Sequence, residues 1–444
     1  MQVYVPSASK YFGNFSWAPE ETVHQEPVKA WEILLMYFVL MLTGNPFFVT
    51  HYDILVAFSF VIPLYYFFRN TRRVISYQTV LIFVFLLGYE LMHAFVYSLD
   101  YSKTIFKLAL VLLLGFAVVQ LLRDKFIRVL VNTMIIISIV SIIFTILCYI
   151  PGINWFLYEL AIKTFPMPPD AGKDYIPWTL LIYTFHPQYF AGEFSYVRNA
   201  GIFWESGAFA VFLNITLYLR YITKRIVHVR DLFDTKSTIL IITTLTTTST
   251  MGFLTLMALL TFFTLKLRTN LKFMFLLLMI LTTYVTFVNV DYLGDKISTQ
   301  LAESTETNNR FGAALMDWED FKKRPLIGSS RRIEVIFNTQ ERSQKTRRPN
   351  GLTNFFREYG LIYCTVYFLL VYRSFRQIFY AHHGYRKFSV ALFGVFLLWL
   401  VSFSELLFDL PFFKALIFLS MVYYPITEPD YQNEPVRQTG FQSV

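Results

Sequence analysis

Long apolar segments separated by short polar ones dominate the pattern along this chain. Twelve of these segments are predicted to be helices, and most have the length needed to cross roughly 30 Å of hydrocarbon. The pattern therefore predicts an all-α polytopic membrane protein of about twelve transmembrane helices, with residues 1–444 forming one transmembrane domain. The segments are 33–49, 52–68, 77–98, 104–122, 127–150, 201–219, 237–248, 250–267, 271–288, 359–377, 388–404 and 410–424.

Composition agrees with a membrane protein. Of the 444 residues, 55% are apolar and only 16% are charged, which leaves too little polar surface for a soluble protein of this length. The N-terminal region lacks the basic and then apolar pattern of a cleaved signal peptide, so the first apolar segment is expected to remain in the mature protein. Cys148 and Cys364 lie in or beside apolar segments and are predicted to be packing residues, with no disulfide framework.

The basic residues of the short loops indicate an orientation. Positive residues in short loops are retained in the cytoplasm, and placing the N-terminus there leaves essentially only Lys103 in the short loops outside. The sequence therefore predicts that both termini, including the tail 425–444, are cytoplasmic. The inside group contains Arg69, Arg72, Arg73, Arg123, Lys125, Arg128, Arg220, Lys224, Arg225, Arg230, Lys236, Lys266, Arg268, Lys272, Arg373, Arg376, Arg386 and Lys387.

Two long segments, 150–200 and 289–358, remain on the non-cytoplasmic side. The first contains apolar stretches interrupted by prolines such as Pro166 and Pro187, which predicts short helices lying at the membrane interface. The second is rich in lysine and arginine. Two interpretations of this basic loop stay open: a solvated loop that attracts acidic lipid headgroups, or a surface whose arginines bind an anionic substrate such as a phosphate or pyrophosphate.

Polar residues inside apolar segments mark candidate chemistry. The segment 198–210 is expected to enter its helix from the outside, with Arg198 at the mouth and Glu205 about two turns further in. A carboxylate at such depth usually faces a cavity or pairs with a base, and the alternative is a buried partner for a nearby arginine. The threonine-rich stretch 243–250 predicts a break in the membrane, with a helix N-terminus near Ser249. A seam of small residues between helices is the equal alternative.

Other polar residues favour structural roles. Glu90 and His93 are spaced i, i+3, which occurs in carboxylate metal sites, but without a second copy they are interpreted as a structural pair. Asp317, Glu319 and Asp320 lie beside a run of basic residues and are interpreted as a charged helical face. No phosphate-binding loop or dinucleotide motif is present in the sequence. No cofactor, metal ion or nucleic-acid partner is therefore expected, and chemistry driven by a nucleotide sugar or by ATP is disfavoured.

Four segments, in this order and in these positions relative to the helices, carry a family resemblance. They are 198–210 (RNAGIFWESGAFA), 248–253 (TSTMGF), the pair 310–314 (RFGAA) and 324–328 (RPLIG), and 350–361 (NGLTNFFREYGL). Together they resemble the bacterial O-antigen polymerase and O-antigen ligase superfamily, over about residues 195–425.

The resemblance implies a GT-C-like glycosyltransferase in the bacterial cell inner membrane. Such an enzyme transfers a sugar chain from undecaprenyl pyrophosphate to an acceptor outside the cytoplasm, without a metal. Donor and acceptor lipids and the bilayer are the implied partners, and a chain-length regulator is a further candidate. Arg198 and Arg310 match the positions that similar proteins use to hold the pyrophosphate. Candidate substrate-binding residues are Arg331, Arg332, Arg347, Arg348, Asn350 and Ser249.

One departure from the family pattern favours polymerase over ligase. Ligases generally have a His-Asn pair where this chain has Pro349 followed by Asn350. The sequence therefore predicts a polymerase that joins lipid-linked oligosaccharide repeat units into O-antigen or a similar surface polysaccharide. Glu205 replaces the missing histidine as the candidate base. The alternatives are a ligase that transfers the chain to the lipid A core, and a transporter or flippase of lipid-linked sugars.

Overall fold

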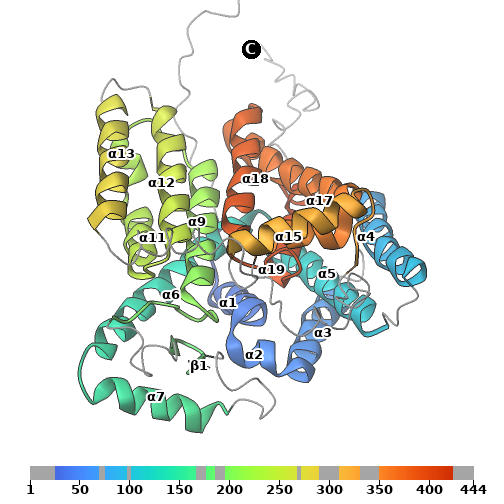
Figure 1. The fold of residues 1–444 in the computed structure, drawn as a ribbon, viewed down its shortest axis with the longest axis horizontal. Coiled ribbons are helices and arrows are strands. Elements are labelled where there is room, and N and C mark those ends of the chain that lie inside the picture. The colour runs from blue at the N-terminus through green and yellow to red at the C-terminus, as the bar shows by residue number, and fades with distance from the viewer. Residues whose placement is uncertain are drawn as a thin grey trace, which may run out of the picture.

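The computed structural model describes residues 26–69, 76–97, 102–166, 177–185, 196–267, 272–289, 310–330 and 350–423. Of these residues, 77% lie in α-helices, which confirms the predicted all-α class. All twelve predicted segments overlap helices, and Figure 1 shows how the helices are arranged. The helices of the N-terminal part are α1 (Ala30–Gly44), α2 (Pro46–Thr50), α3 (Tyr52–Arg69), α4 (Tyr77–Val96), α5 (Ser102–Leu122) and α6 (Phe126–Cys148), with a 3-10 turn at Arg123–Lys125.

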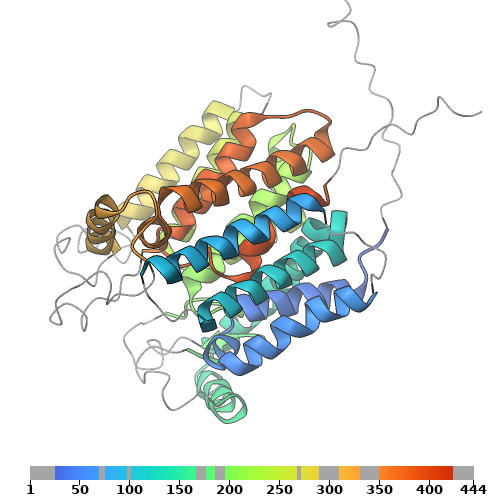
Figure 2. The same cartoon turned by 90° about the vertical axis from the view of Figure 1, so that its right-hand side faces the viewer.

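The remaining elements form the second part of the bundle and its ends. Figure 2 shows the long helices running side by side, with α15 across one end of the bundle. Helices α17 and α18 pack on each other, and α5 packs on α3, α4 and α19. The elements are α7 (Ile153–Thr164), β1 (Trp178–Thr179), β2 (Thr184–Phe185), α9 (Ser206–Thr223), α10 (Val229–Leu232), α11 (Thr235–Thr246), α12 (Thr250–Leu265), α13 (Lys272–Asn289), α15 (Arg310–Lys323), α17 (Gly351–His383), α18 (Phe388–Ser402), α19 (Pro411–Leu416) and a 3-10 turn at Leu419–Met421.

The apolar helices support membrane association. Two helical segments are long and apolar enough to cross a membrane: Tyr77–Val96, and the continuous run Ile105–Cys148 that contains α5, the 3-10 turn and α6. Large apolar side chains also face outward, because Phe68 is 76% and Phe95 88% exposed. Apolar side chains this exposed on long helices fit a surface in contact with lipid. The count of twelve spans and the orientation stay predictions.

The predicted second interfacial helix in the segment 150–200 is wrong. The first apolar stretch forms α7 as predicted, but residues 178–185 form the antiparallel pair β1 and β2, with Trp178 opposite Phe185. Short apolar runs do not distinguish helix from strand by periodicity, and the aromatic and β-branched residues here favour a strand. Asn45, between α1 and α2, fixes the ribbon by donating to Thr179 Oγ1 at 3.1 Å and to the Ile202 carbonyl at 2.8 Å.

Two helix boundaries near the C-terminus also differ from the prediction. α17 continues to His383 and contains one non-helical residue, Gly360, at φ +70° and ψ 179°. The segment predicted as a helix over 410–424 is helical only at Pro411–Leu416 and in the following 3-10 turn. This short element is buried because it packs closely on α5: a Cβ on Gly115 would lie 2.9 Å from the Ala415 backbone nitrogen.

Candidate active site

Two of the four family-like segments meet at one end of the bundle. Arg198 donates from Nε to Thr248 Oγ1 at 3.3 Å. The neighbouring Asn199 is fully buried and donates to Thr246 Oγ1 at 2.9 Å and to Ser141 Oγ at 3.0 Å. These contacts tie the segment before α9 to the turn between α11 and α12. Arg198 is therefore held at this end by defined contacts.

Glu205 is the N-cap of α9 and does not lie two turns inside a helix. Gly201 takes φ +54°, which favours glycine, and its backbone NH donates to Asn199 Oδ1 at 3.0 Å. The Phe203 ring stacks on Phe212 with centroids 4.2 Å apart. The chain thus turns before it becomes helical at Ser206. The prediction that Glu205 lies within a helix is wrong, because the half-buried Glu205 precedes the first helical residue.

A second carboxylate, Glu405, lies beside Glu205. Both Oε1 atoms are 3.0 Å from the point that a Cβ on Gly207 would occupy. Glu405 is only 6% exposed and belongs to the loop between α18 and α19. It was not predicted from the sequence, because 200 residues separate it from Glu205 and no local motif marks it. These two adjacent carboxylates, Glu205 and Glu405, are the central feature of this end of the bundle.

The Glu405 loop also contacts the last family-like segment. A Cβ on Gly351 would lie 1.8 Å from the Glu405 carbonyl oxygen, so only glycine allows this approach. The preceding residue, Asn350, is fully buried and caps α17 by accepting from the Thr353 backbone NH at 3.0 Å. Among the described residues, its Nδ2 has no hydrogen-bond partner. The structure thus gives Asn350 a capping role and leaves one buried donor beside the Glu405 loop.

Helix α15 is attached to α17 by a buried ion pair. Arg357 Nε lies 3.3 Å from Asp317 Oδ1, and these side chains are 4% and 0% exposed. Thr353 donates to Asp317 Oδ2 at 2.9 Å. The interpretation of residues 317–320 as an ordinary charged face is wrong for Asp317, which pairs with Arg357 of α17, and for Asp320, which is only 4% exposed.

The segments 324–328 and 350–361 cross at two glycines. Gly328 and Gly360 have φ values of +76° and +70°, and a Cβ on Gly360 would lie 2.4 Å from the Gly328 nitrogen. The Ser329 NH donates to the Arg357 carbonyl at 2.7 Å, and the Leu361 NH donates to the Pro325 carbonyl at 2.8 Å. The third and fourth family-like segments are therefore packed together through their backbones.

Glu90 and His93 join α4 to this crossing. Tyr359 donates to Glu90 Oε1 at 3.0 Å, and His93 Nε2 lies 2.6 Å from the Ile327 carbonyl oxygen. Tyr89 donates to the Tyr359 carbonyl at 2.8 Å. These contacts agree with the predicted structural role of the pair. In the part of the chain that the structure describes, no group of three His, Cys, Asp or Glu side chains could hold a metal ion.

A buried lysine in α19 was missed by the sequence analysis. Lys414 is fully buried, and its Nζ lies 3.1 Å from Asp409 Oδ1 and 3.3 Å from the Tyr363 hydroxyl. Tyr359 also donates to Asp409, at 3.2 Å. Because burying a charge is costly unless it is paired, this ion pair is the condition under which α19 can pack inside the bundle.

The other predicted site residues divide into two groups. Ser249 accepts from the Gly252 NH at 3.2 Å and is the N-cap of α12, which confirms the predicted helix start. The hydroxyls of Thr243 and Thr244 donate to the carbonyls four residues earlier, so these two threonines have structural roles. Arg310 is the first residue of α15. Its side chain lies outside the described residues, as do Arg331, Arg332, Arg347 and Arg348 in full.

Comparisons with known proteins identify no relative. No protein-family model, curated protein or solved structure matches this chain. The site is therefore interpreted from its own geometry. One end of the bundle brings together a fixed arginine, two adjacent carboxylates and a buried amide donor, which can hold an anion and accept a proton.

Proposed function

We propose that this chain is a membrane glycosyltransferase that joins undecaprenyl-pyrophosphate-linked repeat units into a surface polysaccharide on the non-cytoplasmic face of a bacterial inner membrane. One observation carries the proposal: sequence segments up to about 140 residues apart, selected only for their family resemblance, pack at the same end of the bundle. Residues 198–210 contact the turn before α12 through Arg198 and Thr248, and Glu405 links Gly207 to Gly351.

The proposed reaction assigns a role to each group. An acceptor sugar hydroxyl attacks the anomeric carbon of the donor chain, the bond from that carbon to the pyrophosphate oxygen breaks, and the lipid pyrophosphate leaves. Arg198 stabilises the negative charge that develops on the leaving group. Glu205 takes the hydroxyl proton, and the neighbouring Glu405 orients the acceptor by accepting a second hydroxyl. Arg310 is a further cation for the pyrophosphate.

The test is chain extension by the purified full chain in nanodiscs containing a defined lipid-linked repeat. The wild type should produce longer lipid-linked chains. Arg198→Ala, Arg310→Ala and Glu205→Gln should each lower the rate by about 100-fold or more, the scale of losing one acid–base or charge-stabilising group. Arg386→Ala is the matched control, because Arg386 is exposed after α17, near the other end of the bundle. Normal extension by the site variants would refute the assignment.

A strain test separates this proposal from its alternatives. Deleting a polymerase leaves single repeats on the lipid A core, whereas deleting a ligase leaves none. Transport of lipid-linked sugar without any longer product in the nanodisc assay would indicate a flippase. The position of Pro349 is the sequence feature that favours the polymerase.

A further inference from the structure

A cavity of about 910 Å³ lies at the end of the bundle that Glu205 does not occupy. It is lined by residues near both ends of the described chain, Glu26 and Tyr423. It also contains Arg220, in the last turn of α9, whereas Glu205 caps the first turn. An 18-residue helix is about 27 Å long. The cavity is therefore separate from the candidate active site.

The lining of this cavity carries an excess of positive charge. Seven of its residues are lysine or arginine, and three are aspartate or glutamate. Positive residues in short loops are expected on the cytoplasmic side of a membrane protein, but topology alone does not require them to line one hollow. Converging cations in a concave site raise the local potential and attract anions.

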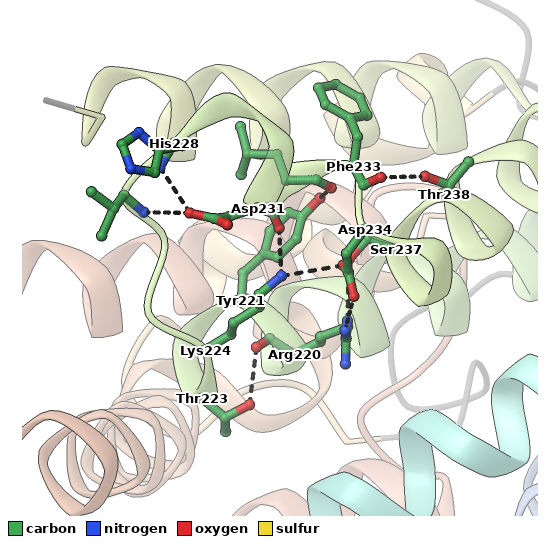
Figure 3. A network of polar contacts seen from close by, with 12 residues as sticks. Arg220, Tyr221, Thr223, Lys224, His228, Asp231, Phe233, Asp234, Ser237 and Thr238 are labelled. Carbon is green, nitrogen blue, oxygen red and sulfur yellow. Dashed lines mark hydrogen bonds and ion pairs between the residues drawn. The ribbon is translucent and has the colours of Figure 1, made fainter. Parts of the chain in front are cut away.

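Some of these cations are fixed in position by a polar network. Figure 3 shows Asp234 between Arg220 and Lys224, forming ion pairs with both. Ser237 donates to Asp234 at 2.6 Å and accepts from Arg220 Nε at 3.1 Å. Lys224 also donates to the Asp231 carbonyl at 2.9 Å. A guanidinium and an ammonium held this way lose little conformational entropy when an anion binds.

The other wall comes from the turn between α5 and α6. Lys125 pairs with Glu26 at 2.6 Å and with Glu32 at 3.5 Å. Lys236 reaches this wall and donates to Asn132 at 2.8 Å. Burial, followed by the positive charge of Arg220, lowers the pKa of Lys236, and Asp234 opposes this only in part. The positive charge around Lys236 therefore exceeds what the nearby carboxylates neutralise.

We propose that this cavity binds a phosphate-bearing anion, supplied by an acidic phospholipid headgroup or by a soluble phosphate compound. Its volume falls within the range of small-molecule sites, roughly 300–1,000 Å³. It thus has room for a glycerophosphate headgroup or a pyrophosphate. Basic pockets between helices on the cytoplasmic side are suited to anionic headgroups. This proposal does not depend on the proposed transferase activity.

The experiment measures binding to the purified full chain in two arms. In the first arm, native mass spectrometry counts lipid bound to protein from phosphatidylcholine nanodiscs with and without phosphatidylglycerol. In the second, inorganic pyrophosphate is titrated into the protein in phosphatidylcholine nanodiscs. The double variant Arg128→Gln/Lys236→Gln removes two cations that line the cavity. It should weaken binding by about tenfold or more in the arm that shows binding. The charge-retaining variant Arg128→Lys/Lys236→Arg should stay within about threefold of wild type.

The control is Arg386→Gln, which removes one positive charge near this end of the bundle but outside the cavity. It should bind like the wild type. Binding in the first arm alone identifies a lipid headgroup, and binding in the second identifies a soluble phosphate compound. Three results would overturn the proposal: no binding in either arm, equal binding by the glutamine double variant, or an equal loss in Arg386→Gln. The charge-retaining variant keeps both positive charges in the cavity. Its binding therefore tests the proposal even where the glutamine double variant fails to fold.

Discussion

The buried ion pair between Arg357 and Asp317 should determine whether α15 stays attached to the bundle. Replacing Arg357 by methionine leaves the Asp317 carboxylate, which is 0% exposed and also accepts from the Thr353 hydroxyl, without its arginine partner. Breaking a buried pair in this way costs about 3–5 kcal/mol. That free energy corresponds to at least about a 100-fold increase in the population with α15 detached. Hydrogen exchange of the α15 amides in nanodiscs should therefore speed up by about that factor.

Two further variants test the physical reason. Arg357→Met combined with Asp317→Asn removes the uncompensated charge and should recover about 1–2 kcal/mol relative to the single variant. Lys163→Met is the control, because it removes an ion pair with Glu159 in which the two side chains are 75% and 63% exposed. It should change the exchange of the α15 amides by no more than about fivefold, because exposed pairs contribute about 0–1 kcal/mol. Wild-type exchange in Arg357→Met, or no recovery in the double variant, would show that the pair does not hold α15.

Three other predictions concern the backbone crossing, the buried lysine and pH. Gly360→Ala should lower the unfolding temperature more than Gly384→Ala. Both glycines have positive φ (+70° and +72°), but only at Gly360 would the added Cβ lie 2.4 Å from another backbone atom, the Gly328 nitrogen. Equal shifts in unfolding temperature would show that the crossing is not the cause. Asp409→Asn should lower the free energy of unfolding by about 3–5 kcal/mol, because it leaves the fully buried Lys414 ammonium without its carboxylate. Lys414→Met should cost only about 1 kcal/mol, because the Asp409 side chain that it leaves behind is 39% exposed. Thermal unfolding compares the two variants, and the reverse order would contradict this reasoning. Burial raises the pKa of Asp234, but hydrogen bonds from Ser237 and Arg220 lower it further, so that the pKa lies below the ordinary value of 3.8. The charged Asp234 therefore stabilises the fold above pH 3.8, and this contribution is lost as the pH falls through the pKa of the folded state. Asp234→Asn should flatten the acid limb of the stability profile, and an unchanged limb would exclude Asp234 as its source.

The helices could be predicted from the sequence because their apolar segments are long, and length is a local property. The predictions that were wrong concern features set by backbone turns and by packing between side chains, which the apolar pattern does not record. The segment beginning at residue 201 reads as a continuous apolar run, yet Gly201 turns the chain and the Phe203 ring packs against Phe212, so the helix starts at Ser206. Asp317 resembles a solvated residue because its neighbours are charged, and only packing on α17 buries it.

The candidate site was predicted in part for the same reason. Arg198 and Glu205 stand in a recognisable segment, and the structure places them at one end of the bundle. Glu405 and Lys414 stand in an apolar stretch with no motif around them. Their importance appears only once Gly207 and Asp409 are placed beside them. Glu405 was missed because its neighbours Glu205 and Gly207 lie about 200 residues away in sequence, and Lys414 because no motif marks its pair with Asp409.

The charges at the candidate site imply that different residues determine donor binding and the chemical step, which steady-state kinetics can test. Among the described residues there, Arg357 and Lys414 are each bound to a carboxylate, so binding a pyrophosphate through them would require breaking a buried pair. If the proposed function holds, donor affinity must depend mainly on Arg198 and on the arginines of the basic loop, and the chemical step on Glu205. Arg347→Gln/Arg348→Gln should therefore raise KM for the lipid-linked donor about tenfold with kcat nearly unchanged, whereas Glu205→Gln should lower kcat with KM nearly unchanged. The measurement is initial extension rate against donor concentration, and a kcat effect of equal size in both variants would refute the division.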